Sequence, residues 1–238
     1  MTERCGKALK PSADGLGIGP SSAIWDGTRL TVHINENAPI TNAPLRGTVT
    51  LEPEILTDFT ADFGTNGRHR WSPIAPRAHV EVRLANPSLA WSGTGYFDMN
   101  RGVEPIEDGF SYWNWSRACL PRKAAILYDV IRREEAVSAS MGIEISADGA
   151  VTPVDVPESC LLASTPIWKM PRQTRCDQGH SASIAKTFED TPFYSRSMLE
   201  TRLLGEPVNA MHESLSLDRF RKRWVQTLLR FRMPRVTL

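Results

Sequence analysis

Apolar and polar residues alternate along many short segments of this chain. Residues 30–34 alternate in this way, and in residues 78–84 the apolar side chains of Val80, Val82 and Leu84 fall on one face. A period of two is the pattern of a β-strand that is buried on one side. Turn-forming pairs separate such segments, among them Asp26-Gly27, Asn86-Pro87 and Asp148-Gly149. The pattern therefore predicts an all-β fold, an antiparallel barrel or sandwich.

The last part of the chain follows a helical period instead. Apolar residues recur there at spacings of three or four: Leu217, Phe220, Trp224, Leu228 and Phe231. Basic residues lie between or just beyond them: Arg219, Arg221, Lys222, Arg223, Arg230, Arg232 and Arg235. This pattern predicts a short basic amphipathic helix. Two interpretations stay open: a helix at an anionic membrane surface, and a closing helix that packs on the β-structure with its basic face in solvent.

Composition narrows the function classes. The chain has 238 residues, a formal net charge of +1 and 41% hydrophobic residues, values typical of a folded globular protein. A nearly neutral chain has no general field that attracts nucleic acid, so we expect no nucleic-acid partner. No apolar run approaches the roughly 18 residues of a membrane-spanning helix. The first ten residues lack the apolar core of a signal peptide. We therefore expect a cytoplasmic protein.

The four cysteines form no C-x-x-C pair, and Cys176 and His180 stand without a second ligand pair at zinc spacing. We expect these cysteines to be reduced and mostly structural, and we predict no metal site.

Residues 69–117 concentrate acidic, histidine and aromatic side chains. If the segment is extended, alternation places side chains on shared strand faces in three groups: His69 with Trp71; Thr94, Tyr96, Asp98 and Asn100; and Trp113, Trp115 and Arg117. Gly93 and Gly95 suit a bulge or a close approach of the backbone beside them. An acid, a histidine and several aromatic rings are then able to converge on one cavity.

These motifs resemble those of a known family, the carotenoid 1,2-hydratases or hydroxyneurosporene synthases. The resemblance rests mainly on three motifs: H-R-W at 69–71, W-S-G-T-G-Y-F-D-M-N-R-G at 91–102 and F-S-Y-W-N-W-S-R at 110–117. Similar shorter segments are M-T-E-R at 1–4, I-G-P-S-S-A-I-W-D-G at 18–27, P-F-Y-S-R at 192–196 and M-H-E-S-L-S-L-D-R-F at 211–220. The resemblance covers nearly the whole chain, and the order and spacing of the motifs make it specific.

Two departures from the family pattern stand out. Family members usually continue upstream of the M-T-E-R segment. We therefore expect residues 1–238 to form a single hydratase-like, lipocalin-like β-barrel region that lacks upstream strands of the full family. The family motif also often reads Tyr-His-Asp where this chain has Tyr96-Phe97-Asp98. Phe97 falls on the strand face opposite Asp98, so we expect this change to matter little.

The resemblance implies an activity. The family adds water across the terminal C1–C2 double bond of acyclic carotenes such as neurosporene and lycopene, giving 1-hydroxy carotenoids. It implies no redox cofactor and no metal, and its functional residues are similar to His69, Trp71, Tyr96 and Asp98. Because the substrate is lipid-soluble, we expect peripheral contact with the inner membrane surface. The predicted contact residues are Arg221, Lys222, Arg223 and Trp224.

Alkene chemistry favours the same residue types. Hydration of an unactivated alkene begins with a proton at C2, for which Asp98 is the predicted donor, and leaves a tertiary cation at C1. The ring faces of Trp71 and Tyr96 are suited to stabilise that cation. His69 is the predicted group that positions or deprotonates water. The predicted substrate-binding residues are Trp91, Trp113, Trp115, Asn100 and Arg117.

Other interpretations of these residues stay open. One alternative is that Arg117 simply neutralises a neighbouring carboxylate. The tryptophans are by default core or rim residues. Glu104, Glu107 and Asp108 are typical of a solvated turn. Three alternatives to a carotenoid hydratase also stay open. They are a non-catalytic lipocalin-like binder of a long apolar isoprenoid, an inactive truncated form, and an enzyme acting on another isoprenoid.

Overall fold

The computed structural model describes residues 4–38, 41–64, 67–134 and 138–232, with side chains to residue 229. The chain divides into two compact units. Unit 1 contains Met1–Glu54, Arg77–Phe97 and Gln226–Leu238, and unit 2 contains Ile55–Pro76 and Asp98–Val225. The expectation of a single region over residues 1–238 stays a prediction.

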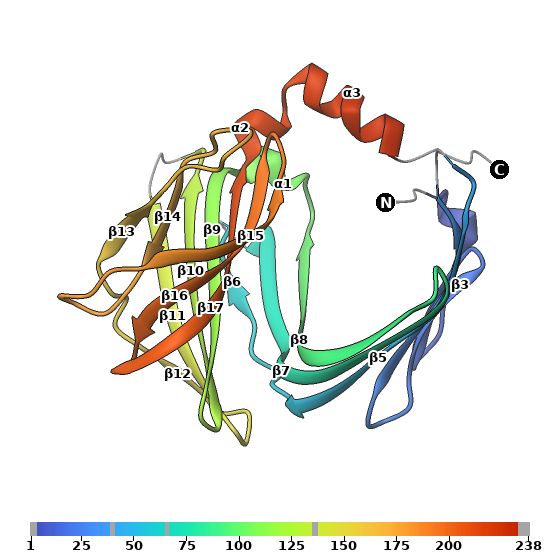
Figure 1. Ribbon diagram of the computed structural model, residues 1–238, viewed down its shortest axis with the longest axis horizontal. Coiled ribbons are helices and arrows are strands. Elements are labelled where there is room, and N and C mark those ends of the chain that lie inside the picture. The colour runs from blue at the N-terminus through green and yellow to red at the C-terminus, as the bar shows by residue number, and fades with distance from the viewer. Residues whose placement is uncertain (1–3, 39–40, 65–66, 135–137, 233–238) are drawn as a thin grey trace. The chain divides into compact units, whose positions relative to one another are not determined.

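Unit 1 is built on antiparallel strands that follow one another in chain order. They are β1 (Leu9–Pro11), β2 (Gly15–Ile18), β3 (Ser21–Trp25), β4 (Leu30–Asn37) and β5 (Pro44–Ile55), followed by parts of β7 (His69–Asn86) and β8 (Leu89–Gly102). A 3-10 turn, η1 (Gly6–Ala8), precedes β1. Each of β1 to β4 pairs with the next strand, β5 lies beside β7, and β8 pairs with β7 (Figure 1). The strands predicted at residues 30–34 and 78–84 are confirmed within β4 and β7.

A close contact within unit 1 explains why position 95 of β8 is a glycine. A Cβ at this position would lie 2.1 Å from Val80 Cγ2 on β7, so only glycine permits this approach. Gly93, two residues earlier, faces open space. The close backbone approach predicted for this glycine pair therefore exists at Gly95 alone.

Unit 2 contains a seven-stranded antiparallel sheet with the order β12-β11-β10-β9-β17-β16-β15 (Figure 1). Its strands are β9 (Phe110–Leu120), β10 (Lys123–Arg132), β11 (Ser138–Ser146), β12 (Val151–Pro153), β15 (Ser183–Asp190), β16 (Tyr194–Leu203) and β17 (Glu206–Ser216). A separate hairpin joins β13 (Ser159–Leu162) to β14 (Arg172–Arg175), and β6 (Ala61–Asp62) pairs with the start of β7. The helices are α1 (Ile106–Gly109), α2 (Leu217–Phe220) and α3 (Arg223–Arg232).

The β13–β14 hairpin packs on one face of this sheet. Leu162 of the hairpin belongs to a buried apolar cluster with Ala118, Leu120, Ala125, Leu127, Leu199, Leu203 and Ala210. Polar groups also join the two parts: Arg172 Nη1 donates to Ser197 Oγ at 2.8 Å, and His212 Nε2 donates to the Gln173 carbonyl at 2.8 Å. Since successive side chains alternate in a strand, Trp113, Trp115 and Arg117 of β9 project from the other face.

That other face meets the first part of β7. Arg117 Nη1 donates to the Pro76 carbonyl at 2.9 Å, which ties β9 to β7 within unit 2. The candidate site is built on this face.

The C-terminal helical pattern is confirmed as α2 and α3. In the part of the chain that the structure describes, no helix is both long enough and apolar enough to cross a membrane.

Candidate active site

Two predicted residues from neighbouring strands contact each other directly. The indole Nε1 of Trp71 on β7 donates a 2.8 Å hydrogen bond to Asp98 Oδ2 on β8. Trp71 is fully buried and His69, two residues earlier, is also buried, whereas Arg70 between them is exposed. The period of two along β7 is thus what brings His69 and Trp71 to the inner face.

An aromatic cluster surrounds Tyr128 of β10. Its ring centroid lies 4.4 Å from that of Phe63, 5.3 Å from Trp71 and 6.2 Å from Trp113. The contacts with Trp71 and Trp113 are edge-on, a preferred geometry for aromatic pairs. Phe63, Trp71, Trp113 and Tyr128 come from four separate segments of unit 2, so the cluster joins those segments around one point.

The Tyr128 hydroxyl stays protonated. Burial raises its pKa, and the negative charges of Asp98 and Glu213 raise it further. Glu213 is on β17, where its Oε1 accepts a 2.9 Å hydrogen bond from Arg196 Nε.

A cavity of about 130 Å³ opens beside this cluster. Its apolar wall is formed by Phe63, Ile106, Phe110, Trp113, Tyr128 and Val130. Its polar wall is formed by His69, Arg70, Asn100, Arg101, Gly102 and Glu104. The volume is similar to that of an engineered cavity of about 150 Å³ that takes up benzene. The space therefore suits a small branched hydrocarbon end, and its lining includes both apolar and polar side chains.

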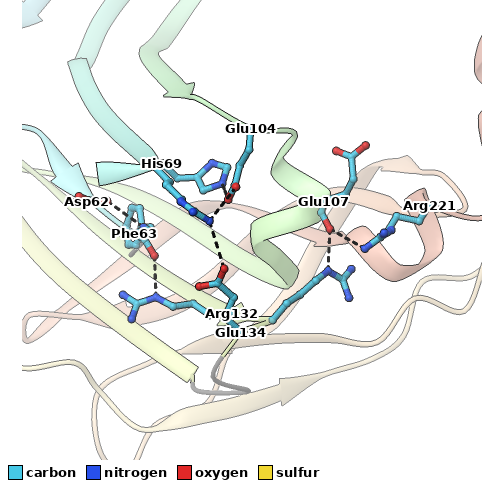
Figure 2. Close-up of polar contacts among 11 residues, drawn as sticks. Asp62, Phe63, His69, Glu104, Glu107, Arg132, Glu134 and Arg221 are labelled. Atoms are coloured by element: carbon cyan, nitrogen blue, oxygen red, sulfur yellow. Dashed lines mark hydrogen bonds and ion pairs between the residues drawn. The ribbon is translucent and has the colours of Figure 1, made fainter. Parts of the chain in front are cut away.

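The side chain of His69 is held from several directions. Its Nε2 lies 3.1 Å from Glu104 Oε1, and its ring centroid lies 4.8 Å from that of Phe110. A Cβ at Gly109 would come within 2.6 Å of His69 Nε2, and one at Gly102 within 2.9 Å of Nδ1. Figure 2 shows His69 and Glu104 turned toward each other. Two glycines therefore leave the room that the imidazole occupies.

Glu104 is not simply part of a solvated turn. Besides His69 it contacts Arg68, whose Nη1 lies 3.3 Å from Glu104 Oε2 and 3.3 Å from Glu134 Oε1 (Figure 2). Its side chain is 25% exposed, against 62% for Glu134. Glu104 lies in the bend that follows β8, as expected of a turn, and is partly buried there by its contacts with His69 and Arg68.

The family model described as carotenoid hydratase CrtC matches residues 1–237. The chain belongs to this family. It is 48% identical to the acyclic carotenoid 1,2-hydratase of Thiocapsa roseopersicina over 99% of this chain and 58% of that protein. It is 36% identical to the enzyme of the same name from Rhodobacter capsulatus, over 99% of this chain and 83% of that protein. The chain thus spans little more than half the length of the first of these relatives.

A solved structure shows the same fold. It is a protein described as AttH from Nitrosomonas europaea, with a TM-score of 0.61 and 10% sequence identity over 88% of this chain and 72% of that one. Together with the antiparallel sheets, this likeness confirms the predicted all-β, lipocalin-like fold class.

The cavity gathers only some of the predicted site residues. His69, Asn100 and Trp113 line it, whereas Trp71 and Asp98 lie next to its lining residue Tyr128. Trp115 is buried outside the lining, and Arg117 is bound to the Pro76 carbonyl. Trp91 is half exposed and Tyr96 half buried, both within unit 1. The catalytic and substrate-binding roles stay predictions.

Sequence reasoning missed Tyr128 and Phe63. The signal for Tyr128 was the apolar run around residues 126–131, which does not by itself distinguish strand from helix. Once this run is a strand, Ile126, Tyr128 and Val130 share a face. Phe63 had no pattern signal, since it follows the two-residue strand β6.

Proposed function

We propose that this chain hydrates acyclic carotenes at the terminal C1–C2 double bond, giving 1-hydroxy carotenoids. The single observation that carries the proposal is the Trp71–Asp98 hydrogen bond beside an aromatic cavity that contains His69. Membership of the carotenoid hydratase family supports it. The cavity size suits the branched end of a polyene better than its whole length.

In the proposed reaction Asp98 supplies a proton to C2 of the alkene. The two π electrons form the new C–H bond, and C1 becomes a tertiary cation. Trp71 Nε1 donates to Asp98 Oδ2, and this bond stabilises the carboxylate that remains after the proton has left.

Aromatic faces then stabilise the cation. Trp113 and Tyr128 line the cavity, and each ring face contributes about 0.5–2 kcal/mol to a cation that lies over it.

Water arrives from the polar wall. His69 holds it, and Glu104 fixes the imidazole through Nε2, so that Nδ1 is the basic nitrogen. The water oxygen bonds to C1, and its proton passes to His69 and finally back to Asp98. Addition of water is redox-neutral overall, since C1 is oxidised as far as C2 is reduced, so the proposed reaction needs no redox cofactor.

We also propose that the chain makes peripheral contact with the inner membrane surface through residues 221–224. Four exposed residues lie just before and at the start of α3: Arg221, Lys222, Arg223 and Trp224. Cationic and aromatic side chains at one end of a helix suit an anionic headgroup layer.

A second candidate is a binder of a long apolar isoprenoid that performs no chemistry. It is favoured by one observation: Tyr128, not Asp98, forms the cavity wall at this point. Expression in a host that accumulates lycopene, followed by chromatography of the pigments, separates the two. The hydratase yields 1-hydroxy products that disappear with Asp98→Asn, whereas a binder retains unmodified pigment in both cases.

A further inference from the structure

The loop between β13 and β14 carries exposed apolar side chains. Ile167 is 73% exposed, and the ring of Trp168 stacks on that of Trp224 with centroids 5.7 Å apart. Both tryptophans remain partly exposed, at 38% and 48%. We call Ile167, Trp168 and Trp224 the aromatic surface. An apolar patch of this kind, surrounded by polar residues, marks a contact site.

The loop that carries the aromatic surface is firmly anchored from beneath. Asp190 Oδ2 accepts a 2.7 Å hydrogen bond from the Ile167 amide. Arg219 donates to the carbonyls of Trp168 and Lys169, at 2.9 and 3.2 Å. At the base of the loop, Thr165 and Met170 are fully buried. These bonds fix the backbone of the loop, and they hold the Ile167 side chain in its exposed position.

Positive charge surrounds the aromatic surface. Lys169, Arg221, Lys222 and Arg223 are exposed and lie next to its members in the sequence. Asp190 accepts hydrogen bonds from the loop amides, Asp218 pairs with Arg133 at 2.6 Å, and Asp108 pairs with Arg221 at 3.7 Å. Since Asp108 offsets Arg221, the positive charge of the rim is supplied by Lys169, Lys222 and Arg223.

We propose that the aromatic surface docks on an anionic lipid bilayer, with Ile167 and Trp168 entering the headgroup layer. Tryptophan favours this layer because its ring is apolar and its N–H is polar, and lysine and arginine attract anionic lipids. The proposal adds the β13–β14 loop, far away in the sequence, to the contact proposed for residues 221–224. It does not depend on the hydratase activity.

The test is flotation of the full chain with phosphatidylcholine vesicles that contain phosphatidylglycerol. Ile167→Ser combined with Trp168→Ser removes the apolar part without touching a buried side chain. Binding should fall at least about tenfold, as expected for the loss of two interfacial apolar side chains. The matched control is Leu161→Ser, which removes an apolar side chain that is 85% exposed on β13 but lies outside the aromatic surface. It should bind like the parent.

A second readout locates the contact. Brominated lipids quench tryptophan fluorescence in the headgroup region, and the quenching should decrease when Trp168 alone is replaced by Phe. Unchanged flotation of the double variant, or an equal loss with Leu161→Ser, would overturn the proposal. So would a parent chain that ignores vesicles and instead self-associates through Ile167, because the surface would then belong to a protein contact. Carotene hydration is measured separately, so its absence would not bear on these outcomes.

Discussion

The Asp98 carboxylate accepts its hydrogen bond from Trp71, a side chain with no solvent exposure at all. A donor that cannot move fixes the orientation of the acid. The two residues are 27 positions apart, on consecutive strands of the same sheet. The bond therefore turns a half-buried aspartate into an oriented group beside Tyr128.

Asp98→Asn should abolish hydration while the protein remains folded. The amide keeps an oxygen that accepts from Trp71 but has no proton to transfer, and general acid catalysis is worth about 10²–10⁴-fold. Activity is measured as 1-hydroxy product per folded protein, with thermal melting as the control. A variant that forms product at a near-normal rate would exclude Asp98 as the donor.

Glu104→Gln should lower the turnover of substrate. The amide oxygen is still able to accept from His69 Nε2, but the negative charge that stabilises an imidazolium formed during the reaction is gone. The measurement is 1-hydroxy product formed per folded protein, with thermal melting as the control. Glu134→Gln is the matched control, since Glu134 also contacts Arg68 but is largely exposed. If both variants behave alike, the effect belongs to Arg68.

Gly109→Ala should displace the imidazole. The new methyl group would meet His69 Nε2 at 2.6 Å, and overpacking of this kind costs about 1–3 kcal/mol. Both the free energy of unfolding and the activity should therefore fall. Gly93→Ala provides the comparison, because its Cβ meets nothing within 4 Å. Full activity in Gly109→Ala would show that His69 has room to move without loss of function.

The protein should become less stable as the pH falls from about 6.5 to about 4. The pKa of His212 is lowered to about 4. Burial is the main cause, the positive charge of Arg172 acts in the same direction, and the hydrogen bond to the Gln173 carbonyl opposes both. In that range the unfolded chain binds a proton that the folded chain does not. The free energy of unfolding thus decreases by up to about 1.4 kcal/mol per pH unit. Urea unfolding across this range measures the slope.

His212→Gln should flatten that dependence while keeping a donor for the Gln173 carbonyl. The variant is expected to be less stable at neutral pH, because it loses packing at a buried position. A slope that persists unchanged in the variant would mean that other groups titrate in this range.

Much of the fold and part of the candidate site were predictable from local pattern. The period of two identified β4 and β7 and placed His69 and Trp71 on one buried face, because side-chain alternation is a property of the strand itself. The helical period identified α2 and α3 for the same reason. The motifs shared with the hydratases pointed to both Asp98 and Trp71, though not to the hydrogen bond between them.

Tertiary structure alone decided which groups meet. His69 and Glu104 are 35 residues apart, and Arg117 reaches the Pro76 carbonyl across 41 residues. Alternation tells on which face a side chain lies but not what lies opposite, since that depends on strand order and register. For this reason Tyr128 and Phe63 joined the site unforeseen. For the same reason the hydrogen bond from Arg117 on β9 to the Pro76 carbonyl on β7 was not foreseen.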